Sequence, residues 1–131
     1  MAGITKIDQL LAEMAPELGV ETYIFATFEG AKYADLASLT PIASFQEKEG
    51  LTLVVERSVA EKAGIPFATT FRKISLQVHS SLDAVGLTAA ISRVLAHKGI
   101  SANIMAAYFH DHIFVPSERA EEALQVLKNL S

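Results

Sequence analysis

The chain has 131 residues, of which half are hydrophobic and a fifth charged, so it can form one ordinary domain or two very small ones. Its net charge of −4 and the lack of a basic stripe exclude nucleic acid and anionic membranes as expected partners. It contains no cysteine, which excludes disulfides, thiolate metal sites and a cysteine nucleophile. We expect a soluble cytoplasmic protein, because the sequence has neither a secretory signal nor an apolar run of about 20 residues.

In the first half of the chain, the pattern predicts a helix, a strand, a hairpin of two strands and a short helix. The first helix has Thr5 at its N-cap and Pro16 as its limit, and its apolar face consists of Ile7, Leu10, Leu11 and Met14. The predicted strands cover 21–28, 42–46 and 51–55, with a helical turn at 33–37 and a hairpin turn at 47–50. Ser58 and Glu61 form a capping box for the short helix, which Gly64 ends.

The second half predicts a strand, a helix, a hairpin and a last helix. The strand at 71–79 is half-buried, because Ile74, Leu76 and Val78 alternate with polar residues. The helix after it ends at Gly99, and its apolar stripe consists of Leu87, Ala90, Ile91, Val94 and Leu95. The hairpin strands cover 100–109 and 112–115, with a turn at His110 and Asp111. Ser117 is the predicted N-cap of the last helix, whose buried face consists of Ala120, Ala123, Leu124 and Leu127.

The two halves of the chain share one pattern of elements. The segments 42–63 and 104–127 both run strand, turn, strand and capped helix. A period of about 60 residues predicts a duplicated α+β unit. We therefore divide the chain into units at 1–68 and 69–131. Each copy alone would bury little apolar surface, so we expect the two to share a sheet or to pack together.

The loop 80–86 before the second-half helix is the first candidate site. Unpaired amides and the positive end of the helix dipole favour a carboxylate there, and Gly86 has no Cβ to keep a ligand away. Asp83 could accept a hydrogen bond from the amino group of a ligand. The other interpretation also stays open: Asp83 is only an N-cap, and Gly86 is only a tight bend.

These residues also carry a family resemblance. The sequence Asp-Ala-Val-Gly-Leu at 83–87, followed by a helix that ends in Ala-His-Lys-Gly-Ile-Ser at 96–101 and by Asn103, resembles the signature of ACT domains. Three longer segments, 45–54, 78–90 and 108–116, resemble a bacterial family of small stand-alone tandem ACT proteins without an assigned function. The resemblance covers the second half almost throughout and the first half from about Tyr23.

The resemblance implies an α+β fold: two ferredoxin-like βαββαβ units in tandem, with helices on one face of an antiparallel sheet. Because the chain begins with a helix, a permuted strand order in the first unit stays open, and the first half shows no recognisable copy of the loop. Many ACT loops carry a proline where this chain has Val85, so no particular effector is carried over. The resemblance implies binding of an amino acid or similar small molecule by Ser80, Ser81, Leu82, Asp83, Ala84, Val85, Gly86, Leu87 and Asn103.

The histidines offer further chemistry. His110 and His112 flank Asp111 at a hairpin tip and could hold a metal with a fourth donor, although the spacing is unspecific. A polar tip, or a tip that contacts a ligand or a second chain, is the alternative. His79 beside Ser80 suggests a nucleophilic pair, but no Gly-x-Ser-x-Gly elbow accompanies it, so a hydrogen bond to a ligand is favoured.

The sequence therefore leads to the hypothesis of a non-catalytic regulatory protein that binds an amino-acid-like small molecule, needs no cofactor and forms a homodimer. Two alternatives stay open. One is a pure interaction or dimerisation module without a ligand, and the other is a small metal-binding enzyme that depends on His79, His110 and His112.

Overall fold

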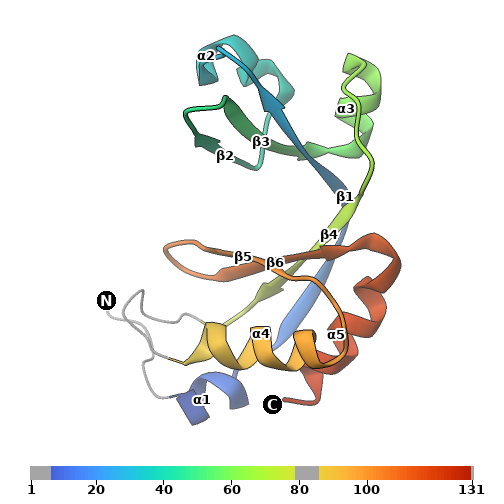
Figure 1. Ribbon diagram of the computed structural model, residues 1–131. Helices are drawn as coiled ribbons and strands as arrows, with labels where there is room; N and C mark the ends of the chain where they lie inside the picture. The colour runs from blue at the N-terminus through green and yellow to red at the C-terminus, as the bar shows by residue number, and fades with distance from the viewer. Residues whose placement is uncertain (1–6, 79–85, 131) are drawn as a thin grey trace. The chain divides into compact units, whose positions relative to one another are not determined.

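The computed structural model of the protein describes residues 7–78 and 86–130 (Figure 1). Within these ranges, no helix is long and apolar enough to cross a membrane. The elements in chain order are α1 (Ile7–Ala12), β1 (Pro16–Phe28), α2 (Tyr33–Leu36), the 3-10 turn η1 (Ala37–Leu39), β2 (Ala43–Gln46), β3 (Leu51–Glu56), α3 (Arg57–Ala63), β4 (Phe71–Leu76), α4 (Leu87–His97), β5 (Asn103–Ala106), β6 (Asp111–Pro116), the 3-10 turn η2 (Ser117–Arg119) and α5 (Ala120–Lys128).

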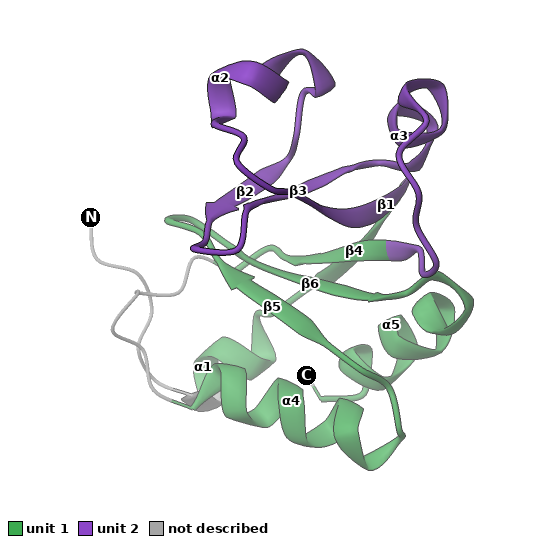
Figure 2. Cartoon of the chain, turned by 45° about the horizontal axis from the view of Figure 1, so that its top comes forward, with its two compact units in different colours: residues 1–20, 72–131 green, residues 21–71 purple. Residues whose placement is uncertain are grey.

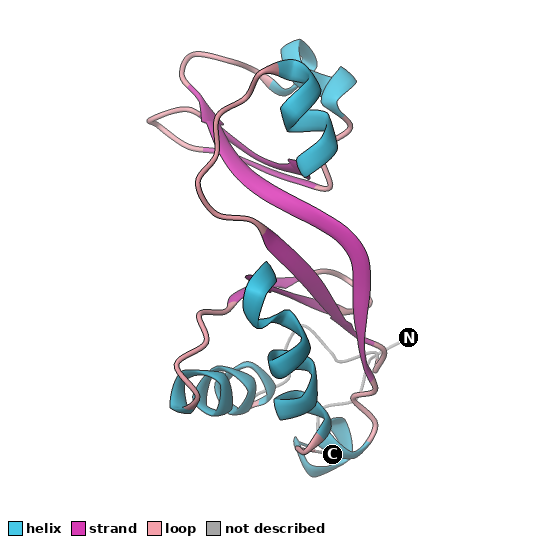
Figure 3. Cartoon of the chain, turned by 90° about the vertical axis from the view of Figure 1, so that its right-hand side faces the viewer, coloured by secondary structure: helices cyan, strands magenta, loops and turns pink. Residues whose placement is uncertain are grey.

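The chain forms two compact units that do not follow a single cut in the sequence (Figure 2). Unit 1 contains residues 1–20 and 72–131, and unit 2 contains residues 21–71. β1 is one continuous strand of 13 residues (Figure 3). The division falls inside β1, so α1 and the start of β1 group with residues 72–131 in unit 1. The N-terminal helix had suggested that the strand order of the first unit is permuted. In the structure, this helix belongs to the unit that contains the C-terminal half. A division of the repeats at 68/69 stays a prediction.

Both units have the same succession of elements. Unit 2 runs β1-α2-β2-β3-α3, and unit 1 runs β4-α4-β5-β6-α5 after its N-terminal segment. The strand order β2-β3-β1-β4-β6-β5 places the hairpin of each unit beside that unit's first strand. The pairs β1–β3, β2–β3 and β5–β6 are antiparallel. The predicted fold class, two ferredoxin-like units with an antiparallel sheet, is confirmed.

Unit 1 has one apolar core between its helices and one face of its strands. The predicted alternation in β4 is confirmed, since Ile74 and Leu76 are fully buried. On α5, Leu124 was predicted to be buried but is only half-buried. Burial of one apolar stripe from each helix against the strands is the main stabilising contribution to this unit. The buried members are Leu10, Met14, Ile74, Leu76, Val78, Leu87, Ile91, Leu95, Ile100, Ile113, Val115, Ala120, Ala123 and Leu127.

Unit 2 has a smaller core, formed by Ile24, Leu51, Leu53, Val55 and Ala60. The predicted hairpin turn is confirmed, because the amide of Glu47 donates to the carbonyl of Gly50 at 2.9 Å. A Cβ on Gly50 would lie 3.0 Å from the carbonyl oxygen of Phe28, so β1 approaches this position too closely for any side chain.

Some predicted boundaries were wrong. β1 starts at Pro16 rather than at residue 21, although proline, glycine and glutamate in its first part have low strand propensity. The hairpin of unit 1 turns at 107–110, where the Ala107 amide donates to the His110 carbonyl at 3.0 Å. Asp111 is therefore a strand residue that pairs with Ala106, rather than part of the turn. The predicted strand 100–109 shortens to β5 for the same reason.

Two predicted N-caps were also wrong. α3 begins at Arg57, directly after β3, with Glu56 at the N-cap position instead of Ser58. Register with Tyr23 keeps Glu56 in the sheet, so the helix starts before Ser58 can cap it. Ser117 begins the 3-10 turn η2, and the N-cap residue of the last helix, α5, is Arg119. The predicted end of α3 is confirmed, because Gly64 has φ 71° there.

Candidate functional site

The N-terminus of α4 lies where the candidate loop enters the helix. Gly86 is the N-cap residue, with φ 101°, and its carbonyl accepts the first helical hydrogen bond from the Ala90 amide at 2.9 Å. A side chain is strained at this φ, which gives a backbone reason for glycine here. Because glycine has no side chain, the N-cap residue itself supplies no capping acceptor to the first-turn amides.

The other predicted ligand residues are only partly within the described chain. Ser80, Ser81, Leu82, Asp83, Ala84 and Val85 lie outside the described residues, as does His79. The side chain of Leu87 is 3% exposed and belongs to the core, so only its backbone amide is suited to contact a ligand. Asn103 lies on β5, where its side-chain amide donates to the Phe114 carbonyl across the hairpin at 3.4 Å.

Unit 2 contains a counterpart of this loop, which the sequence did not reveal. It is the segment 29–32 between β1 and α2, and Gly30 has φ 73° there. The amide of Lys32 donates to Oδ2 of Asp35 at 3.0 Å, and the Asp35 amide donates back to the Lys32 carbonyl at 3.0 Å. This four-residue helix is closed by its own aspartate, and it offers less to a ligand than α4. The sequence signal that could have revealed this counterpart is the strand followed by Gly30 and by a short helical turn that contains Asp35.

Within the described part of the chain, the histidines of the β5–β6 hairpin do not join a group of metal ligands. The rings of His110 and His112 have centroids 6.4 Å apart, and Nδ1 of His112 is in a hydrogen bond of 2.8 Å with Oγ of Ser75. Asp111 alternates with His112 along β6, so it faces the opposite side of the strand. Among the residues the structure describes, no group of three or more metal-ligating side chains comes together.

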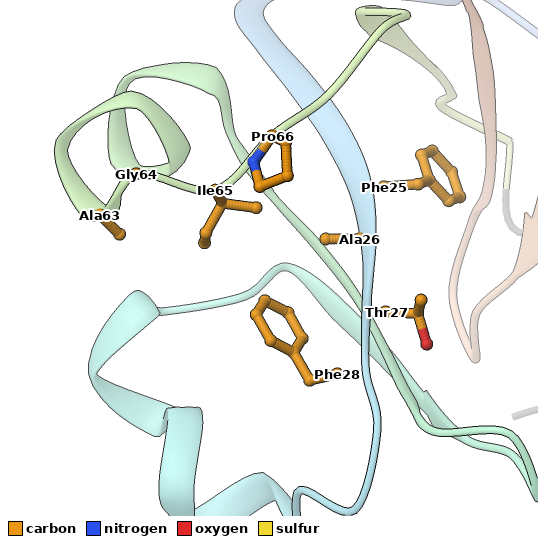
Figure 4. Close-up of a pocket in the computed structure, with 8 residues that line it drawn as sticks. All are labelled: Phe25, Ala26, Thr27, Phe28, Ala63, Gly64, Ile65 and Pro66. Atoms are coloured by element: carbon orange, nitrogen blue, oxygen red, sulfur yellow. The ribbon is translucent and has the colours of Figure 1, made fainter.

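A shallow pocket lies in unit 2 between β1 and the end of α3, with a volume of about 620 Å³. Figure 4 shows Ala26 and Phe28 directed from β1 toward the side where Ile65 lies, whereas Phe25 and Thr27 point the other way. The walls are mainly apolar and Ile65 is half-buried, so this pocket offers packing surface but no charged side chain to orient a ligand.

Both halves of the chain resemble a known domain. Residues 2–72 and residues 68–129 each match a model of the ACT domain. The chain belongs to the ACT-domain family. The two matched segments confirm that the ACT domains are in tandem, with their meeting point near the start of β4. No curated protein sequence matches this ACT protein.

Solved structures agree with the family. A Vibrio cholerae protein of unknown function, described as a possible transport protein, is 53% identical over 91% of both chains, with a TM-score of 0.84. The ligand-free regulatory subunit of aspartate kinase from Thermus thermophilus is 13% identical over 90% of this chain and 98% of that chain, with a TM-score of 0.65. Clostridium acetobutylicum aspartate kinase is 11% identical over 99% of this chain and 36% of its own, with a TM-score of 0.66. Because these identities are low, the similarity to the regulatory subunit and to the aspartate kinase shows a shared fold only.

Proposed function

We propose that this ACT protein is a non-catalytic regulatory protein that binds an amino-acid-like small molecule at the N-terminus of α4. ACT-family membership and the regulatory subunits that share its fold support the regulatory class. The 80–85 segment and Asn103 stay predicted contributors to the site. A homodimer in the cytoplasm is the expected setting, with ligand binding coupled to the pairing of units or chains.

The observation that carries this proposal is the helix start at Gly86. α4 has 11 residues, so its dipole is well developed, and its N-cap is a glycine at φ 101°. The first amides of such a helix favour a carboxylate, and every amino acid carries one. The corresponding helix in unit 2 has four residues and is capped by Asp35, so we expect one site per chain rather than two.

Thermal melting of the full chain against the twenty amino acids tests the proposal. A ligand at a hundredfold excess over its Kd stabilises the protein by about 2.7 kcal/mol, so a specific binder stands out from the other nineteen. Gly86→Ala should reduce the shift, because alanine is strained at this φ and the helix start must move.

Gly99→Ala is the matched control at the other end of α4. Gly99 has φ 72°, and a Cβ there meets no atom within 4 Å, so the substitution introduces backbone strain away from the site. The ligand shift should persist in this variant. A ligand whose shift is equally strong in wild type and Gly86→Ala would contradict the placement of the site.

One observation favours the alternative of an interaction module. Tyr108 and Phe109 at the tip of the β5–β6 hairpin are 64% and 60% exposed, and their rings pack edge to face at 5.1 Å. Exposed aromatic pairs of this kind are typical of protein contacts. A melting temperature that depends on protein concentration, and on no amino acid, would support this alternative. Loss of that dependence in Tyr108→Ser would attribute it to the tip.

A further inference from the structure

A cluster of hydrogen-bonding and basic side chains lies on the strands of unit 1, on the face opposite the core. Ile74 and Leu76 point into the core, so Lys73 and Ser75 point to the other face of β4. His112 on β6 reaches the same face, because its Nδ1 is 2.8 Å from Oγ of Ser75. Ser75 and His112 are 37 positions apart in sequence, and they meet because β4 and β6 are neighbours in the sheet.

The three side chains are chemically suited to a small oxyanion. Lys73 provides an ammonium group and Ser75 a hydroxyl group, while His112 provides an imidazole whose second nitrogen is outside the Ser75 bond. All three side chains are half-buried, so their environment strengthens charge–charge interactions but still admits solvent. Met105, which pairs directly with His112 on β5, adds an uncharged wall on the same face.

The charge of Lys73 reaches His112. Burial, followed by Lys73 and then His110, lowers the pKa of His112, while Asp111 acts in the opposite direction. Asp111 lies on the core side of β6 and is 8% exposed, so its carboxylate is turned away from the face that carries His112. After burial, Lys73 contributes most to this lowering, so its positive charge acts at the imidazole of His112.

We propose that Lys73, Ser75 and His112 form an oxyanion-binding site for the carboxylate or phosphate group of a small metabolite. The site is separate from the N-terminus of α4 and does not depend on that proposal. The anion accepts hydrogen bonds from the lysine and the serine, and the imidazole binds a proton as the anion arrives. Binding therefore strengthens as the pH falls toward the range in which His112 is protonated, and by linkage the anion raises the pKa of His112.

The test follows the histidine ring protons by NMR in the full chain, with sulfate as a tetrahedral probe and acetate as a carboxylate probe. Sulfate keeps its charge across the titration, so any change in midpoint belongs to the protein. His112→Gln assigns the His112 signal. We expect a probe to raise the midpoint of His112 while leaving that of His97, an exposed residue in the last turn of α4, nearly unchanged. A larger response to sulfate points to phosphate metabolites, and a larger response to acetate points to carboxylates.

Two substitutions separate a built site from general screening. Lys73→Gln should abolish the anion-dependent rise in the His112 midpoint, whereas Lys98→Gln, at an exposed position after α4, should preserve it. Equal small responses of His112 and His97 in wild type would mean an adventitious ion only and would overturn the proposal. An undiminished response in Lys73→Gln would overturn it as well. The wild-type comparison is decisive by itself if a variant fails to fold.

Discussion

The two units of this ACT protein share a topology but differ in the helix that follows their first strand. In unit 1 this helix, α4, has 11 residues, and Leu87, Ile91 and Leu95 are buried along one side. In unit 2 it is α2, with four residues, none of them buried, closed by Asp35. A repeated fold therefore preserves the sheet, while the helix entry, where the dipole and free amides lie, is free to differ.

The largest expected effect concerns the packing of these two helices. Leu95→Ala should lower the free energy of unfolding by about 2–5 kcal/mol, because Leu95 is fully buried and leaves a cavity. Leu36→Ala in α2 should cost about 1 kcal/mol or less, because Leu36 is half-buried. Urea unfolding measures both values. Equal losses would mean that α2 contributes to its core as much as α4, which would remove the contrast between the units.

A smaller effect should come from the cap of α2. Asp35→Ala removes the acceptor of the Lys32 amide and should cost about 0.5–2 kcal/mol, at the low end because the pair is exposed. Asp35→Asn, which retains an acceptor, is the matched control and should cost less. Hydrogen exchange of the α2 amides reads the effect locally. If the alanine variant exchanges like wild type, the aspartate does not close this helix.

The smallest effect concerns the pH dependence of stability in unit 1. The pKa of His112 is lowered in the folded state from its usual 6.5, so the folded protein binds fewer protons than the unfolded chain below that pH. The free energy of unfolding should therefore decrease as the pH falls through 6.5 toward the folded-state pKa. Chemical denaturation between pH 7.5 and about pH 5 measures this decrease, and His112→Gln should make it shallower. A decrease that is identical in the variant would assign it to another group.

Much of the local structure could be predicted from short-range patterns. The alternation around Ile74 and Leu76 indicates a strand with one buried face, and glycine at position 64 indicates a helix end. The boundaries that failed depended on partners outside the local sequence. Residues 16–20 have poor strand propensity, but they are part of β1, which is hydrogen-bonded to β4 in the sheet. Asp111 is a strand residue because it pairs with Ala106.

The candidate site divides in the same way. The position of Gly86 at the N-terminus of α4 could be predicted from the sequence, because a loop, a glycine and an apolar helical pattern follow one another there. The Ser75–His112 pair was not found, because a distance of 2.8 Å between residues 37 positions apart depends on strand order. The hypothesis on Ser80 and His79 relied on two residues that are adjacent in sequence. Adjacency in sequence does not indicate which residue on a neighbouring strand a side chain contacts.

The sequence by itself determined the elements, the duplication and the ACT-like helix entry at Gly86, because these follow from hydrophobic periodicity and local backbone preference. Only the tertiary structure decided that residues 1–20 group with residues 72–131 in one compact unit, and that His112 meets Ser75. The physical reason is that burial and strand pairing join residues distant in the chain, and no local propensity specifies which partners meet.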